Sequence, residues 1–118
     1  MSKYEFTGKT LEYDGCTLRQ IRRLSDGSIG GWIEKESNLS QEGTCWVYGD
    51  AWVYGKAKVS GDAKVSGDAL VCDSAKVSGN AEVHGDAQVS GDAWVSGNAK
   101  VSGNAEVYGN AKVFDNAK

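Results

Sequence analysis

The chain has 118 residues, the size of one ordinary domain, and a formal net charge of −3. This charge excludes broad electrostatic attraction to duplex nucleic acid or to an anionic membrane, because both require positive charge. With 40% apolar residues the chain is too apolar for simple disorder, and 16 glycines with no proline favour turn-rich β structure over a helical bundle.

No apolar run approaches the roughly 20 residues that a membrane helix needs, and the first residues lack the apolar segment of a secretion signal. We therefore expect a cytoplasmic protein without a membrane partner. The three cysteines, Cys16, Cys45 and Cys72, have no CxxC spacing, so they predict reduced thiols rather than a disulfide framework or a zinc site.

The first 43 residues contain no Val or Ala and have the pattern of a small β unit. Residues 10–18 predict two strands around a tight turn at Asp14-Gly15, and residues 18–24 continue as a strand before Ser25-Asp26-Gly27. An open stack of strands exposes backbone and apolar side chains at its ends, so we expect residues 1–43 to cap one end of the array that follows. The other end would be shielded by a partner or left open.

From residue 44 onward the sequence repeats every six residues. All 12 Val lie on this lattice from Val47 to Val113, and all 12 Ala lie on it from Ala51 to Ala117, giving the unit Ala-x-Val-x-Gly-[Asp/Asn]. A six-residue step turns a helix by about 600°, so a helix cannot collect the valines on one face. In a strand the Ala and Val face one side and the Gly-containing pair makes a corner. Residues 44–118 therefore predict a stacked β-solenoid.

This hexad resembles the repeat of the bacterial hexapeptide-repeat transferase superfamily. The segments around Gly30-Gly31-Trp32-Ile33 and from Asn38 to Tyr48 are similar to the N-terminal part of YdcK-like acetyltransferases and of related short phage and prophage proteins. The resemblance implies an all-β, left-handed parallel β-helix of about four coils with three hexads per coil. It also implies homo-oligomers, most often trimers, formed by packing of solenoid faces.

With three hexads per coil, equivalent residues of successive coils stack and the outward side chains form three faces. The second face carries the least charge, and large apolar patches usually mark a partner surface, so we expect it to be buried between subunits. Its predicted interface residues are Trp52, Tyr54, Leu70, Cys72 and Tyr108. The alternative is that a flat sheet simply tolerates exposed aromatics.

The third face carries Lys58, Lys76 and Lys112 around Trp94. An aromatic ring with point charges beside it can bind a nucleotide or another small anion. The alternative is a solvated ladder of lysines that keeps the sheet from aggregating.

All three arginines, Arg19, Arg22 and Arg23, lie within five residues of the cap, and their planar guanidinium groups suit phosphate or carboxylate recognition. Acidic residues close in sequence would neutralise them instead; the candidates are Glu12, Glu34 and Glu36.

Two corners depart from the repeat. Lys56 replaces the acidic or amide residue, and Asp73-Ser74 replaces Gly-Asp, so we expect local distortions there. The remaining Asp and Asn corners lack the dense carboxylate pattern of calcium-binding rolls, and their corner geometry explains them.

The single histidine, His84, is a weak candidate for a general base beside Glu82, and one histidine excludes a three-histidine zinc site. The array also lacks the interrupting loops and C-terminal element that the resemblance associates with coenzyme A binding. We therefore predict a non-enzymatic binding module without cofactor or metal. It would be a phage or prophage accessory protein that sequesters a small anionic ligand, such as a signalling nucleotide, or blocks a host protein. The alternative is a coenzyme-A-dependent acyltransferase that uses His84.

Overall fold

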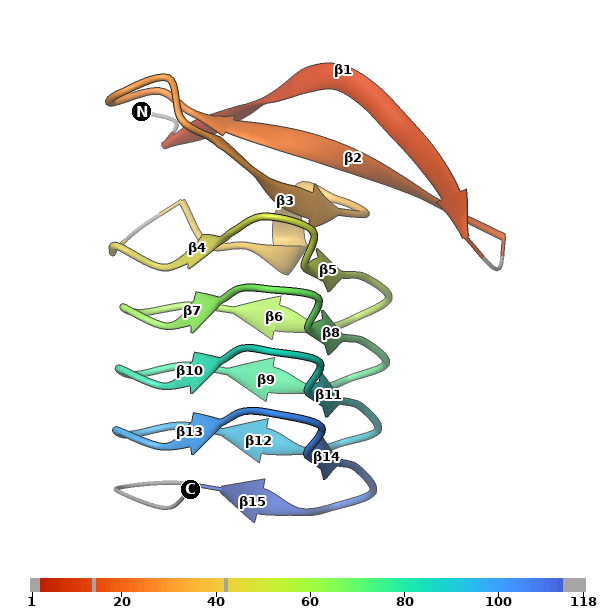
Figure 1. Ribbon diagram of the computed structural model, residues 1–118, viewed down its shortest axis with the longest axis vertical. Helices are drawn as coiled ribbons and strands as arrows, with labels where there is room; N and C mark the ends of the chain where they lie inside the picture. Colours follow the sequence, from red (N-terminus) through yellow and green to blue (C-terminus); the bar gives the residue numbers. More distant parts are fainter. Residues whose placement is uncertain (1–2, 14, 42, 114–118) are drawn as a thin grey trace.

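The computed structural model describes residues 3–13, 15–41 and 43–113, which form a hairpin lying on a regular stack of coils (Figure 1). Each hexad supplies one two-residue strand whose second residue is the repeat valine. The twelve strands are β4 (Trp46–Val47), β5 (Trp52–Val53), β6 (Lys58–Val59), β7 (Lys64–Val65), β8 (Leu70–Val71), β9 (Lys76–Val77), β10 (Glu82–Val83), β11 (Gln88–Val89), β12 (Trp94–Val95), β13 (Lys100–Val101), β14 (Glu106–Val107) and β15 (Lys112–Val113).

Every third strand pairs in parallel, so three ladders run along the stack. They are β4-β7-β10-β13, β5-β8-β11-β14 and β6-β9-β12-β15. Each valine in a ladder is in register with the valine three hexads later, as Val53 is with Val71. The predicted left-handed parallel β-helix of about four coils is therefore confirmed. Residues beyond 113, including Ala117 of the repeat, lie outside the described residues.

The interior of the stack contains the small repeat side chains. The valines from Val47 to Val107 and the alanines from Ala51 to Ala99 are buried. Cys45, which takes the Ala place in the first repeat, is buried with them. Because Ala and Val alternate with outward residues, the core is narrow and continuous, and each outward side chain stands on one of three flat faces.

The corners depend on residues that tolerate a positive φ. Gly67 has φ +67°, and a Cβ built on it would lie 2.9 Å from the backbone nitrogen of Gly85 in the next coil. The predicted distortion at Asp73-Ser74 is wrong, because Asp73 adopts φ 60°, the conformation of the corner glycines. Its neighbours keep the coil-to-coil bonds, since Lys56 N donates to Asp73 O at 2.8 Å and Ser74 N donates to Gly91 O at 2.9 Å. Asp tolerates this region better than most residues because its short polar side chain bonds locally.

The predicted hairpin is present in the cap. Strand β1 (Tyr4–Tyr13) pairs antiparallel with β2 (Cys16–Arg23), and Tyr13 is the partner of Cys16. Asp14 of the predicted turn lies outside the described residues. Strand β3 (Ile29–Ile33) pairs antiparallel with β2 and parallel with β5, so the hairpin extends the β5 ladder into a seven-stranded sheet.

The stack of coils begins before residue 43. Ile33 is in register with Val53, and Leu39 forms an isolated parallel bridge with Val59. In a regular coil the paired residues are three hexads apart, as Val47 and Val65 are. In these two pairs the residues are two positions further apart than that. Residues 31–41 therefore supply two rungs of a coil that is two residues longer than the others. The short 3-10 helix η1 (Glu36–Asn38) lies between these rungs.

None of the helices in the described part of the chain has the length and apolar character needed to cross a membrane.

The corner glycines allow the packing between coils to be measured separately from backbone strain. Gly67 and Gly103 share a corner column and both have positive φ, but a Cβ on Gly103 would meet nothing within 4 Å. We expect Gly103→Ala to lower the free energy of unfolding by about 1 to 2 kcal/mol, the cost of a Cβ in the left-handed region. Gly67→Ala should cost roughly 1 to 3 kcal/mol more, because its Cβ collides with the next coil.

Chemical denaturation followed by circular dichroism at fixed protein concentration gives both values. Equal losses in the two variants would contradict a tight approach between neighbouring coils.

Candidate functional site

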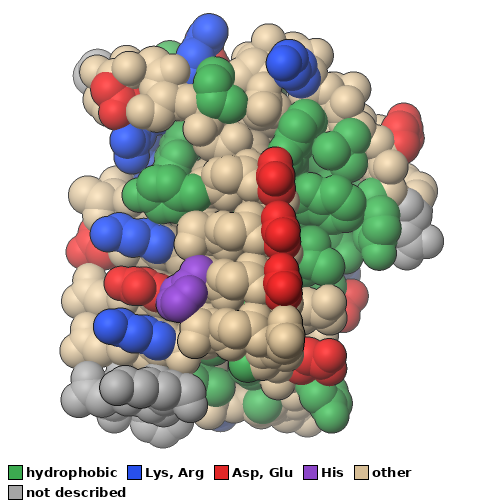
Figure 2. Space-filling view, viewed as in Figure 1, with side chains coloured by type: hydrophobic (Ala, Val, Ile, Leu, Met, Phe, Trp, Pro, Cys, Tyr) green, Lys and Arg blue, Asp and Glu red, His purple; other side chains and the backbone are tan. Residues whose placement is uncertain are grey.

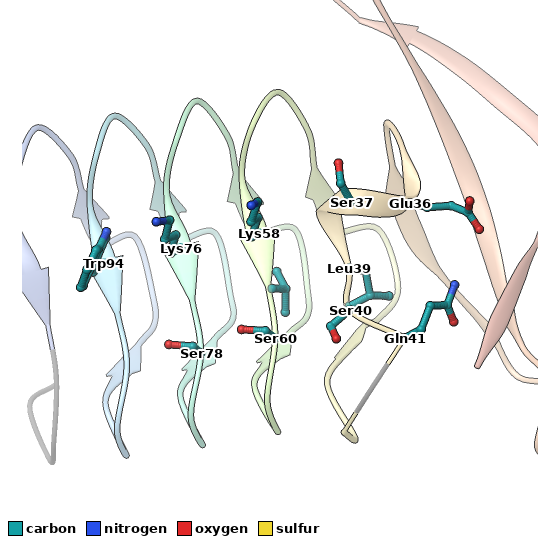
Figure 3. Close-up of a pocket in the computed structure, with 11 residues that line it drawn as sticks. Glu36, Ser37, Leu39, Ser40, Gln41, Lys58, Ser60, Lys76, Ser78 and Trp94 are labelled. Atoms are coloured by element: carbon teal, nitrogen blue, oxygen red, sulfur yellow. The ribbon is translucent and has the colours of Figure 1, made fainter. Parts of the chain in front are cut away.

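A groove runs along the face formed by β6, β9 and β12 (Figure 3). Its volume is about 490 Å³, and the segment that follows β3 closes one end. The lining residues are Glu36, Ser37, Leu39, Ser40, Gln41, Lys58, Val59, Ser60, Lys76, Ser78 and Trp94. The floor is thus one ladder of the solenoid, and the end wall comes from the cap.

The structure brings together most of the predicted lysine and tryptophan residues. Lys76 Nζ lies 5.2 Å from the centre of the Trp94 ring, and Lys112 Nζ lies 5.4 Å from it. Both distances are within the range of cation–π attraction. These lysines come from the rungs before and after Trp94, because β12 pairs with β9 and with β15. Lys58 is one rung further away, in register with Lys76, and lines the groove without contacting the indole.

Trp94 is 45% exposed although two lysines contact it. Since lysines approach from both neighbouring rungs, a bound ring has better access to the free edge of the indole than to its faces. The groove therefore offers an aromatic edge, ammonium groups and the hydroxyls of Ser60 and Ser78.

Buried hydrogen bonds hold the end wall in place. The single proton of the Tyr4 hydroxyl is shared between Leu39 O at 2.7 Å and Glu36 O at 3.1 Å, so β1 holds both ends of the η1 turn. Burial raises the pKa of Tyr4 far above its ordinary value, which keeps the hydroxyl protonated as a donor. Asn38, which is 0% exposed, binds the turn to the coil below through its side-chain amide.

The sequence prediction did not include the wall residues Ser37, Leu39, Ser40 and Gln41. A signal for them exists in the six-residue spacing of Ile33 and Leu39, which are both buried and both take the Val place of the repeat. The two extra residues of the first coil break the valine lattice and hide this signal.

The arginines are engaged with separate partners. Arg22 forms an ion pair with Glu5, which faces it across the β1–β2 pairing, and Arg23 pairs with Asp26 at 2.9 Å. The hydrogen bond from Arg23 holds the pKa of Asp26 well below its usual range. Arg19 lies with its guanidinium carbon 5.5 Å from the centre of the Phe6 ring. The acidic partners of Arg22 and Arg23 are thus Glu5 and Asp26.

The acidic residues suggested from the sequence, Glu12, Glu34 and Glu36, do not form these ion pairs. That suggestion was wrong because it relied on nearness in sequence, whereas the strand register and the turn after β2 determine the neighbours. Among the described residues that line the groove beside Trp94, none is an arginine.

The cap partly covers the second face, which is the outer side of the β5-β8-β11-β14 ladder. The Tyr13 ring packs 4.8 Å from the Trp52 ring and 5.9 Å from the Tyr54 ring, while Tyr108 is 66% exposed. Leu70 and Cys72 are half-buried, and burial raises the pKa of the Cys72 thiol. Figure 2 shows apolar side chains gathered here beside a column of acidic residues. A hollow of about 470 Å³ on this face is lined by Leu11, Tyr13, Trp32, Asp50, Trp52, Asp68 and Leu70.

His84 lies on a different face from the groove. It follows β10 in the β4-β7-β10-β13 ladder, and its backbone nitrogen donates to Val101 O at 2.9 Å. Glu82, its proposed companion, is in register with Lys64 and Lys100 of the neighbouring rungs. Across residues 3–13, 15–41 and 43–113, no group of three or more His, Cys, Asp or Glu side chains could hold a metal ion.

Comparisons with known proteins concern the repeat array. Residues 87–103 match the family described as YdcK Beta solenoid repeat. A protein of Escherichia coli (strain K12), named Uncharacterized acetyltransferase YdcK, is 51% identical over 37 residues; the match covers 26% of this chain and 11% of that protein. The match thus spans a small part of the relative's length. The array is thus similar to YdcK β-solenoid repeats and consistent with the hexapeptide-repeat superfamily, which confirms the predicted resemblance. The matched residues 87–103 lie in the hexads, outside the segments at 30–48 on which the resemblance to YdcK-like proteins was based.

Proposed function

We propose that the chain is a non-catalytic β-solenoid that binds a small anionic ligand in the groove of β6, β9 and β12. The observation that carries the proposal is the convergence of Lys58, Lys76 and Trp94 on one hollow of about 490 Å³. This volume lies in the range of small-molecule sites. The lysines supply positive charge, and the serine hydroxyls supply donors with fixed spacing.

The chemistry favours a ligand with an anionic group and an aromatic or apolar part. Ammonium groups attract the anion, and the indole together with Leu39 supplies apolar contact. A signalling nucleotide has both parts, so sequestration of such a nucleotide is the role we propose. We also propose an accessory role in the cytoplasm of a phage-infected bacterium, on the sequence resemblance of the segments around residues 30–48 alone.

One observation favours acyl transfer as a second candidate: the name of the E. coli relative includes an acetyltransferase activity. In this chain, the general base would be His84. The candidate is weaker because His84 lies on a different ladder from the groove, so the proposed anion site and the proposed base do not converge.

Calorimetric titration with cyclic nucleotides and nucleoside monophosphates tests ligand binding. We expect one of them to bind, and Lys76→Glu to weaken it at least about tenfold, since it replaces a favourable charge by a repulsive one. Trp94→Ala should weaken the same ligand by a similar factor because it removes the aromatic contact. Lys100→Glu, at an exposed position on another face, is the matched control and should leave the affinity unchanged.

Unchanged affinity in both Lys76→Glu and Trp94→Ala would reject the groove as the site. If no small ligand binds, a host protein becomes the partner to search for instead. Acetyl-CoA turnover that disappears in His84→Ala would replace the binding proposal by the enzyme.

We also propose that the chain forms a homo-oligomer, most simply a trimer, through the second face. Tyr108 and Leu70 remain accessible there after Tyr13 has covered Trp52 and Tyr54. The rung between them carries Gln88, so the two side chains are separate apolar contacts on one face. Exposed apolar side chains gathered on one face mark a candidate interface.

The solution mass of the wild-type chain should be a multiple of 12.5 kDa, three in the simplest case. Leu70→Glu combined with Tyr108→Glu should give the mass of a single chain, because two buried charges would oppose association. Light scattering coupled to gel filtration measures both masses. A monomeric wild type would refute the oligomer.

A further inference from the structure

The two corners that break the repeat lie in one column of the solenoid. Lys56 and Ser74 are three hexads apart and occupy the corner position that carries Asp or Asn in the other repeats. The coils stack here as elsewhere, because Lys56 N donates to Asp73 O and Ser74 N donates to Gly91 O. At this position two neighbouring rungs therefore lack the acidic or amide side chain, and one of them carries a lysine, while Asp73 holds the preceding position of the second corner.

This corner borders a hollow of about 420 Å³ next to the groove. Its lining is Lys35, Ser37, Lys56, Lys58, Ser74 and Lys76. The hollow thus combines four lysines with two hydroxyls, and none of its described lining residues is acidic. Lys58, Lys76 and Ser37 also line the groove, so the two hollows are adjacent.

The four lysines of this hollow have no ion-pair partner among the residues that the structure describes. The ion pairs there join Arg22 to Glu5 and Arg23 to Asp26, and neither involves this corner. Glu36 lines the adjoining groove, but Figure 3 shows its carboxylate pointing away from Lys58 and Lys76. Two carboxylates also lie at this corner, where Glu34 accepts from Gly55 N and Asp73 accepts from Gly91 N. The four lysines outnumber them, so the hollow keeps a positive potential that attracts anions.

The cap segment that carries Lys35 is fixed next to Lys56. Asn38 Oδ1 accepts from the backbone nitrogens of Glu34 and Lys35 at 3.0 and 2.8 Å. Its Nδ2 donates to Gly55 O at 3.2 Å and to Ala57 O at 2.8 Å, the carbonyls on either side of Lys56. Glu34 Oε1 accepts from Gly55 N at 2.8 Å. These bonds hold the two backbones together before any ligand arrives, which lowers the entropic cost of binding.

We propose that this lysine corner binds a chain of two or more linked phosphates. A single phosphate leaves most of the four positive charges unbalanced, whereas a diphosphate carries more charge and more acceptor oxygens over a greater length. The proposal rests on the proposed function and extends it: the phosphate chain occupies the corner, and any aromatic part attached to it lies in the groove toward Trp94.

Pyrophosphate and orthophosphate are the probes for the corner, titrated by calorimetry at low ionic strength. We expect pyrophosphate to bind more tightly. Lys56→Asp restores the corner residue of the regular repeat, so the fold should be retained, and pyrophosphate affinity should fall at least about tenfold. Ser74→Asp also restores the repeat and should weaken pyrophosphate, while Lys100→Asp makes the same charge change as Lys56→Asp on another face and should have no effect. Circular dichroism checks that each variant is folded.

Nucleoside mono- and diphosphates distinguish a free phosphate chain from one attached to a nucleoside. Trp94→Ala should weaken the nucleoside diphosphate and leave pyrophosphate unchanged if the ligand spans both hollows. Pyrophosphate that does not bind, or that binds Lys56→Asp as well as wild type, overturns the lysine corner even if nucleotides bind the groove. Lys56-dependent pyrophosphate binding without any Trp94-dependent ligand supports the corner and instead refutes the proposed groove function.

Discussion

The backbone hydrogen bonds between successive coils are the constraint on which the rest of the structure depends. In the β5 ladder, Trp52 N donates to Ala69 O, Leu70 N to Ala87 O and Gln88 N to Ala105 O, each at 3.0 Å. These bonds fix the rung spacing at about 4.8 Å. The same bonds place every outward side chain directly above its equivalent in the next coil. The surface is therefore a direct consequence of the repeat register.

This constraint explains why the whole array could be predicted, whereas only the hairpin could be predicted before it. From Val47 onward, one spacing determines pairing, burial and face, so the three ladders follow from counting. Before Val47 the first coil has two additional residues, and its apolar positions are filled by Ile33 and Leu39 instead of valine. Gly31 takes the Ala place, where a Cβ would lie 2.6 Å from Ala51 O and from Val47 Cγ1. A pattern of Val and Ala at steps of six residues therefore fails to detect this first coil.

The candidate groove likewise has one part that could be predicted from the repeat and one part that could not. Its floor of Lys58, Lys76 and Trp94 was predicted, because these residues belong to the regular ladder. Its end wall was not, because the position of Leu39 depends on a buried amide, Asn38, and on the hydroxyl of Tyr4, which is distant in sequence. The arginine partners were missed for a related reason. Glu5 meets Arg22 only through the antiparallel register of β1 and β2, which includes an irregularity between Phe6 and Thr10.

In a chain this regular, the surface chemistry differs from coil to coil only where an outward side chain changes and the backbone conformation does not. Asp73 shows how such a change is accommodated. It adopts φ 60°, and its Oδ2 accepts from Gly91 N at 3.0 Å, a bond that offsets part of the strain of a non-glycine residue in that conformation. The corner therefore keeps the shape of the others while its side chains differ. Lys56 and Ser74 occupy this unchanged framework, so their effect on the surface is one of charge and hydrogen bonding rather than of fold. The same holds for Trp94, which stands in a ladder position otherwise held by lysine and leaves the buried Val95 beneath it in register with Val77.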